Sequence, residues 1–81
     1  MAQIDINNLK KINKERNTVH EEVYATYTVF DNEGQKYLQI DTYGKAGREN
    51  PEKISQSIQL NRRTASYLVN LLIREFDLKL H

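Results

Sequence analysis

The 81-residue chain contains no cysteine, so a disulfide framework, a thiolate zinc site and a cysteine nucleophile are all excluded. It also lacks any apolar run near the roughly 18 residues of a membrane-spanning helix, and its N-terminus has no apolar stretch of the kind found in signal peptides. We therefore expect a soluble protein of the cytoplasm. Two histidines without a cysteine make an unconvincing metal site, and no acid and base surround a predicted pocket. An enzyme is not expected, and neither is a cofactor.

Neither sign of charge dominates the sequence. Twelve lysines and arginines against eleven aspartates and glutamates give a formal net charge of +1. That balance excludes a polyanion binder that works by bulk charge and excludes an acidic mimic of DNA, so nucleic-acid binding would need a local patch of cations. A chain of this length makes one domain with a thin core, for which dimerisation is a common remedy.

Two segments alternate apolar and polar residues and predict a β-hairpin. They are residues 22–30 (EVYATYTVF) and 36–43 (KYLQIDTY), joined by the turn signal DNEG. Opposed residues of an antiparallel pair share a face, so apolar must meet apolar. The predicted register satisfies this rule with these pairs: Val29 with Leu38, Tyr27 with Ile40, Ala25 with Thr42, Phe30 with Tyr37, Tyr24 with Tyr43, and Asp31 with Lys36.

A third strand and a helix are predicted after the polar loop at residues 44–53. The strand covers roughly residues 54–60 (ISQSIQL), with Ile54, Ile58 and Leu60 on one face. Asn61 is expected to cap a helix over residues 62–77, whose apolar stripe consists of Ala65, Leu68, Val69, Leu72, Ile73 and Phe76. The predicted fold class is α+β: a twisted antiparallel sheet of three or four strands with the C-terminal helix packed on its apolar face.

The first 20 residues are more polar and are expected to be a flexible or short helical segment, outside a single α+β domain of residues 21–81. Asn7 or Asn8 could cap a short helix through KKINKER at residues 10–16, and the alternative is a loose tail.

The sheet face turned away from the helix is the candidate for function. It would carry Tyr24, Thr26, Thr28, Phe30, Tyr37, Gln39, Asp41, Tyr43, Ser57 and Gln59. It could simply be a wet face, or be covered by the N-terminal segment, or form the seam of a homodimer. Alternatively, its aromatic rings could stack unpaired bases while cations at the strand ends bind phosphates. Those cations are Lys36, Lys45, Arg48 and Lys53, and Asp41, Glu49 and Glu52 oppose them.

The succession YTVFDNEGQKYLQIDTYG, polar loop, SIQLNRRTASYLVNLLI resembles the DNA-binding core of the positive cofactor four (transcriptional coactivator p15) family, over about residues 24–76. The most specific pieces are LQIDTY at 38–43 and IQLN at 58–61. Members of that family form homodimers that bind single-stranded DNA on their sheets. The strands and loop are less basic here, and Gly44 stands where the family closes its second strand with an aromatic residue. The resemblance implies these DNA contacts: Lys36, Tyr37, Gln39, Tyr43, Lys45, Arg48, Lys53 and Gln59.

Alternation and resemblance together predict a non-enzymatic, homodimeric, transcription-coactivator-like module that binds single-stranded nucleic acid with little base specificity. The alternative is a protein-interaction accessory module, such as a phage or defence-system regulator, that docks by an edge strand or by its helix.

Overall fold

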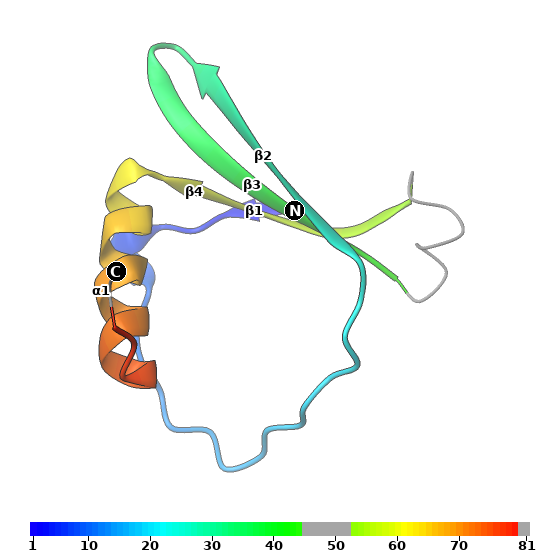
Figure 1. The fold of residues 1–81 in the computed structure, drawn as a ribbon, viewed down its shortest axis with the longest axis vertical. Helices are drawn as coiled ribbons and strands as arrows, with labels where there is room; N and C mark the ends of the chain where they lie inside the picture. The colour runs from blue at the N-terminus through cyan, green and yellow to red at the C-terminus, as the bar shows by residue number, and fades with distance from the viewer. Residues whose placement is uncertain (45–52, 80–81) are drawn as a thin grey trace.

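The structure, a computed structural model, describes residues 1–44 and 53–79. Its elements are β1 (Ala2–Gln3), the 3-10 helix η1 (Ile6–Asn8), β2 (Ala25–Asn32), β3 (Gln35–Tyr43), β4 (Ile54–Asn61) and α1 (Arg62–Phe76). The four strands form one sheet in the order β1-β4-β3-β2, and the helix follows β4 (Figure 1). The α+β class is confirmed. The sheet is mixed rather than wholly antiparallel, because β1, which the sequence did not predict, runs parallel to β4.

The hairpin of β2 and β3 has the predicted register, from Ala25 opposite Thr42 to Asp31 opposite Lys36. Immediately before the first residue of β2, the carbonyl of Tyr24 accepts from the backbone N–H of Tyr43 at 3.0 Å, which continues the predicted pairing. The turn is built on Glu33 at φ 52° and Gly34 at φ 79°. Two consecutive left-handed residues define a type I′ turn, whose twist matches that of the two strands of a hairpin.

The pairing of β3 with β4 contains one irregularity. Ile40 lies opposite Ile58 and Thr42 opposite Gln56, but the next pair is Tyr43 with Ile54, so β4 has an extra residue there. Side chains alternate along a strand, and the bulge shifts that alternation by one. Ile54 therefore pairs beside Tyr43, and the prediction that it shares a face with Ile58 was wrong.

Helix α1 begins as the sequence predicts. The side-chain oxygen of Asn61 accepts from the backbone N–H of Thr64 at 2.9 Å, which satisfies one of the free donors of the first turn. Thr64 is fully buried, and its hydroxyl donates to the carbonyl of Ile4 at 3.4 Å. The helix ends at Asp77, a left-handed residue at φ 53°. Its contacts are with β4 and with η1, so the chain's first residues are packed against its last helix.

The helix predicted at residues 10–16 does not form. The helical turn lies earlier, at η1, where Oδ1 of Asp5 accepts from the N–H of Asn7 at 3.0 Å. Residues 9–24 contain no helix or strand and cross from α1 to β2 in a long arc (Figure 1). Ile12 is 69% exposed, so the chain gains no apolar burial that would favour a helix there. This stretch is neither the predicted helix nor a loose tail, because it connects β1 and η1 with β2.

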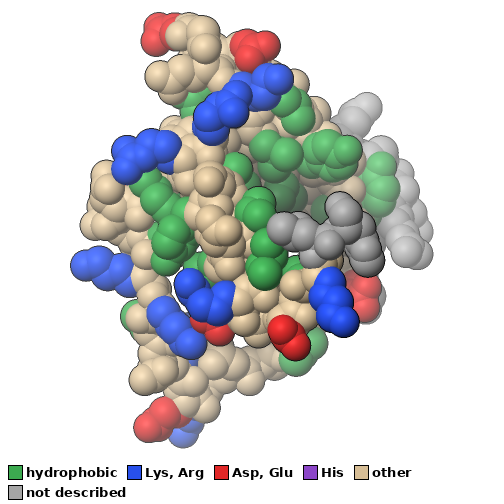
Figure 2. All heavy atoms as spheres, turned by 60° about the vertical axis from the view of Figure 1, so that its left-hand side comes forward, with side chains coloured by type: hydrophobic (Ala, Val, Ile, Leu, Met, Phe, Trp, Pro, Cys, Tyr) green, Lys and Arg blue, Asp and Glu red, His purple; other side chains and the backbone are tan. Residues whose placement is uncertain are grey.

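The two apolar surfaces of the chain remain largely open. Along one row of the sheet, Tyr27, Ile40 and Ile58 lie opposite one another and are 70%, 38% and 41% exposed. On α1, Val69 and Phe76 are 51% and 70% exposed. We call the first set, with Val29 and Leu38 of the neighbouring row, the apolar face, and we call Val69, Leu72 and Phe76 the outer stripe of the helix. Figure 2 shows apolar side chains open at the surface in several places.

Consequently, the chain has little core of its own. Within the described ranges, Tyr43 is the only hydrophobic side chain classed as buried. The solvent-accessible surface is 7700 Å², whereas a folded monomer of this mass exposes about 5,000 Å². The radius of gyration is 14.8 Å, compared with about 12 Å for a compact domain of this length. No helix within the described ranges has the length and apolar character needed to cross a membrane.

Candidate nucleic-acid interface

The sheet side opposite the apolar face carries mostly polar side chains and is continuous across all four strands. Its central row consists of Gln3 on β1, Gln59 on β4, Gln39 on β3 and Thr28 on β2, each opposite the next. We call this side the polar face. Its members are Gln3, Thr26, Thr28, Phe30, Tyr37, Gln39, Asp41, Tyr43, Ser57 and Gln59. Apart from Gln3, all were predicted for it, because alternation along the strands assigns them.

A buried carboxylate lies near the centre of the polar face. Asp41 is 7% exposed, and Ser57, opposite it on β4, is 5% exposed. Oδ1 of Asp41 accepts from the hydroxyl of Ser57 at 2.5 Å and from Nε2 of Gln39 at 2.8 Å. Gln39 in turn accepts, at its Oε1, from Nε2 of Gln59 at 2.8 Å. Burial of a carboxylate is tolerated only when such donors satisfy it, so this network fixes the centre of the face.

Aromatic pairs flank this network at both ends. Phe30 and Tyr37 stack with ring centroids 5.6 Å apart and planes at 19°, and both side chains are half-buried. Tyr24 and Tyr43 lie 5.3 Å apart with planes tilted by 49°. The hydroxyl of Tyr43 also bonds Thr26 at 3.1 Å. Since Tyr43 is only 8% exposed, its ring offers almost no surface for a base, whereas Phe30 and Tyr37 are each partly exposed.

The predicted cations are less well gathered than the predicted polar residues. Lys36 pairs with Asp31 and alternates to the same side of β3 as Leu38, which is the apolar face. Lys53 is exposed immediately before β4. Lys45 and Arg48 lie outside the described residues. On the side of the molecule seen in Figure 2, lysine and arginine side chains are spread between apolar ones rather than collected in one patch.

A hollow opens on the polar face beside β1. It has a volume of about 220 Å³ and is lined by Met1, Ala2, Gln3, Gln39, Ser57 and Gln59. Sequence reasoning missed it, because the two residues of β1 are too few to show a periodic pattern and its pairing with β4 joins distant parts of the chain. The presence of β1 adds a third glutamine to the row and a wall to the hollow.

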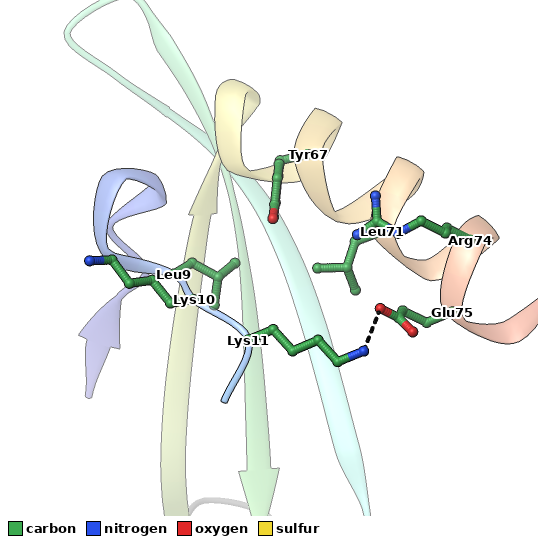
Figure 3. Close-up of a pocket in the computed structure, with 7 residues that line it drawn as sticks. All are labelled: Leu9, Lys10, Lys11, Tyr67, Leu71, Arg74 and Glu75. Atoms are coloured by element: carbon green, nitrogen blue, oxygen red, sulfur yellow. Dashed lines mark hydrogen bonds and ion pairs between the residues drawn. The ribbon is translucent and has the colours of Figure 1, made fainter. Parts of the chain in front are cut away.

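A second depression lies away from the sheet's polar face, between α1 and the segment after η1 (Figure 3). Leu9, Tyr67 and Leu71 line its apolar part, and its volume is about 270 Å³. Lys11 and Glu75 form an ion pair of 3.4 Å across it. We call it the helix groove. Lys10 and Arg74 also line it, which makes the charge around it positive.

Comparison with protein-family models, with curated proteins and with solved structures found no match. Within the described residues, no group of three histidine, cysteine, aspartate or glutamate side chains is arranged to hold a metal ion. A functional assignment therefore depends on the chain's own geometry.

Proposed function

We propose that this protein is a non-enzymatic, transcription-coactivator-like module that binds single-stranded nucleic acid on the polar face. The observation that carries the proposal is the continuity of this face: a row of amide and hydroxyl side chains crosses four strands beside the stacked pair of Phe30 and Tyr37. Aromatic rings on an open sheet stack unpaired bases, at about 1–3 kcal/mol per base. Amide side chains bond base edges in the same plane.

The central carboxylate sets the orientation of the strand in this proposal. Asp41 repels phosphate groups, so the bases turn toward the sheet and the backbone runs along its rim. Lys53 stands exposed at the start of β4, where it can neutralise a phosphate. Lys36 belongs to the other side of the sheet and is not part of this binding surface.

The proposed module is a homodimer. Its surface exceeds that of a typical folded monomer of the same mass by about 2,700 Å², more than the roughly 800 Å² that each partner buries in a stable complex. The excess includes the apolar face and the outer stripe of the helix, which both remain open within one chain. A second copy supplies a matching pair of apolar surfaces, since a two-fold interface uses the same patches on both subunits. The proposal also includes a cytoplasmic location, with which a chain without cysteine is compatible.

Fluorescence anisotropy with a labelled mixed-sequence 12-mer tests the proposal. Binding is expected at low salt and should weaken as salt rises, because each neutralised phosphate releases a counterion. Tyr37→Ala should weaken binding about tenfold by removing a stacking surface. Tyr67→Ala is the matched control, since Tyr67 is 42% exposed on α1 and lies off the sheet. No binding at about 50 µM in low salt would end the proposal. An equal loss of binding in both variants would show that the polar face is not the binding site.

The alternative function, a protein-interaction accessory module, is favoured by the helix groove. Its apolar lining and positive rim suit an acidic, amphipathic segment of a protein partner, to which this chain would bind as a phage or defence-system regulator. Under this alternative, Leu71→Asp should release a bound protein partner that withstands high salt. Tyr37→Ala should leave that complex intact. The nucleic-acid proposal expects the reverse pattern, so the two variants separate the alternatives.

A further inference from the structure

The bonds around Asp41 determine which way two glutamine side chains point. An ionised carboxylate can only accept hydrogen bonds, so Gln39 must turn its NH₂ group toward Oδ1 of Asp41. The carbonyl of Gln39 then faces β4, and Gln59 must present its own NH₂ group to it. The carbonyl oxygen Oε1 of Gln59 is left at the free end of this chain. Flipping either amide would set two donors or two acceptors against each other.

Two acceptors on the polar face therefore have no protein donor. Neither Oε1 of Gln59 nor Oδ2 of Asp41 takes part in a hydrogen bond among the described residues, whereas Oδ1 of Asp41 takes two. In the same residues, no fully buried side-chain nitrogen or oxygen lacks a partner, so neither of these two oxygens is completely shielded from solvent. Both belong to half-buried or buried side chains that are held in place by neighbours. Each is therefore a positioned acceptor rather than a mobile surface group.

We infer that the polar face selects bases that carry an amino group, namely cytosine, adenine and guanine, over thymine and uracil. The inference rests on the proposed function and adds the base preference of that same site. An amino group offers two N–H donors to free acceptors, whereas thymine and uracil offer a single ring N–H between two carbonyl oxygens, which the carboxylate of Asp41 disfavours. The hollow beside Gln59 has a volume of about 220 Å³, which is large enough for one base.

The same acceptors disfavour a phosphate at this position. A phosphate oxygen is itself an acceptor with negative charge, so it gains nothing from the carbonyl of Gln59 and is repelled by Asp41. The chain of bonds from Asp41 to Gln59 thus makes the centre of the face a site for base edges. A row of freely rotating amides would not distinguish a base edge from a phosphate. This selectivity was not part of the sequence-based expectation, which assigned the affinity to stacking and cations.

Oligo-dC and oligo-dT 12-mers provide the test, because both are pyrimidine strands and differ mainly in the amino or carbonyl group at position 4. The wild-type protein is expected to bind oligo-dC about tenfold more tightly than oligo-dT. Gln59→Leu should weaken the preference, because it removes the acceptor of Gln59 and leaves only Oε1 of Gln39 free at this position. Gln56→Leu is the matched control, since Gln56 is exposed, lies on the same strand and pairs with Thr42 on the opposite face. It should keep the preference.

The outcomes separate this inference from the proposed function. Equal binding of the two strands by the wild-type protein, or tighter binding of oligo-dT, overturns the base preference and leaves the proposed function standing. Binding of neither strand at low salt overturns the proposed function itself. A preference that is undiminished in Gln59→Leu also overturns the inference, because the acceptor of Gln59 would then have no part in reading the base. If Gln59→Leu fails to fold, Asp41→Asn gives the same test, since an amide at position 41 no longer imposes one orientation on Gln39.

Discussion

The apolar face gives the most direct prediction, because a single charge placed on it should separate the two subunits of the proposed dimer. Ile40 lies in the middle of its row, between Tyr27 on β2 and Ile58 on β4. In Ile40→Asp, the dimer would bury one unpaired carboxylate from each subunit. The effective penalty is several kcal/mol for each buried ion, and the two-fold symmetry applies it twice. We therefore expect association to weaken by at least about 1,000-fold, since each 1.4 kcal/mol is a factor of ten.

The cost within one chain should be much smaller. Ile40 is 38% exposed there, so a carboxylate at this position still reaches water. Replacing the isoleucine loses only its partial burial, about 1–2 kcal/mol. The main effect of the substitution should therefore be on association, and the separated chains, with so little core of their own, should unfold at lower temperature.

Light scattering during gel filtration checks this prediction over a hundredfold range of concentration. The wild-type protein should have twice the 9.5 kDa mass of one chain, and Ile40→Asp should have the mass of one chain. Val19→Asp makes the same chemical change at a position that is 98% exposed and outside the sheet, so it should stay dimeric. A wild-type protein that remains a single chain at every concentration, with a melting temperature independent of concentration, would refute the reasoning.

Four further predictions concern single interactions in the fold, each measured by thermal unfolding at fixed protein concentration. Asn61→Ala removes the N-cap of α1 and should cost about 1 kcal/mol, a fall of roughly 4–8 °C in melting temperature; Asn61→Asp keeps an acceptor, and an equal loss in both would contradict the cap. Glu33→Asn should stabilise by a few tenths to about 1 kcal/mol, because asparagine tolerates the left-handed conformation at φ 52°. Gly34→Ala should destabilise by about 1–2 kcal/mol through backbone strain alone, since nothing lies within 4 Å of an added Cβ; an unchanged melting temperature would refute this. Lys11→Ala should change stability by less than about 0.5 kcal/mol, because its ion pair with Glu75 is largely exposed.

The parts of the fold that the sequence predicts correctly are those governed by local periodicity. A slip by one residue would set apolar residues of 22–30 against polar residues of 36–43, and the observed register, with Val29 opposite Leu38, avoids this. The cap at Asn61 is likewise local, because its acceptor lies three residues before its donor. The same alternation assigns Tyr37, Gln39 and Gln59 to one face, as the strand pairing confirms. Their binding role stays a prediction.

The parts that the sequence misses depend on contacts between distant segments. The pairing of Ala2 and Gln3 with β4 depends on residues more than fifty positions away, and two residues cannot show a period. The bulge that moves Ile54 to the other side arises where β3 and β4 must fit together, not within either strand alone. From the sequence alone, Asp41 is only a negative charge that opposes the phosphate-binding cations at the strand ends. Its bond to Ser57, which gives it a structural role, requires the register between two strands.

Strand β2 forms one border of the sheet, and in the described parts of the chain no strand pairs with its outer side. An unpaired strand edge is a template on which further chains can add, and Asp31 is the only charged residue in the eight residues of β2. Lysines, prolines and bulges that usually discourage such growth are missing from this strand. If partly unfolded protein accumulates, fibrillar aggregation should therefore begin at β2. The substitution Thr28→Lys, in the middle of this strand, should suppress it.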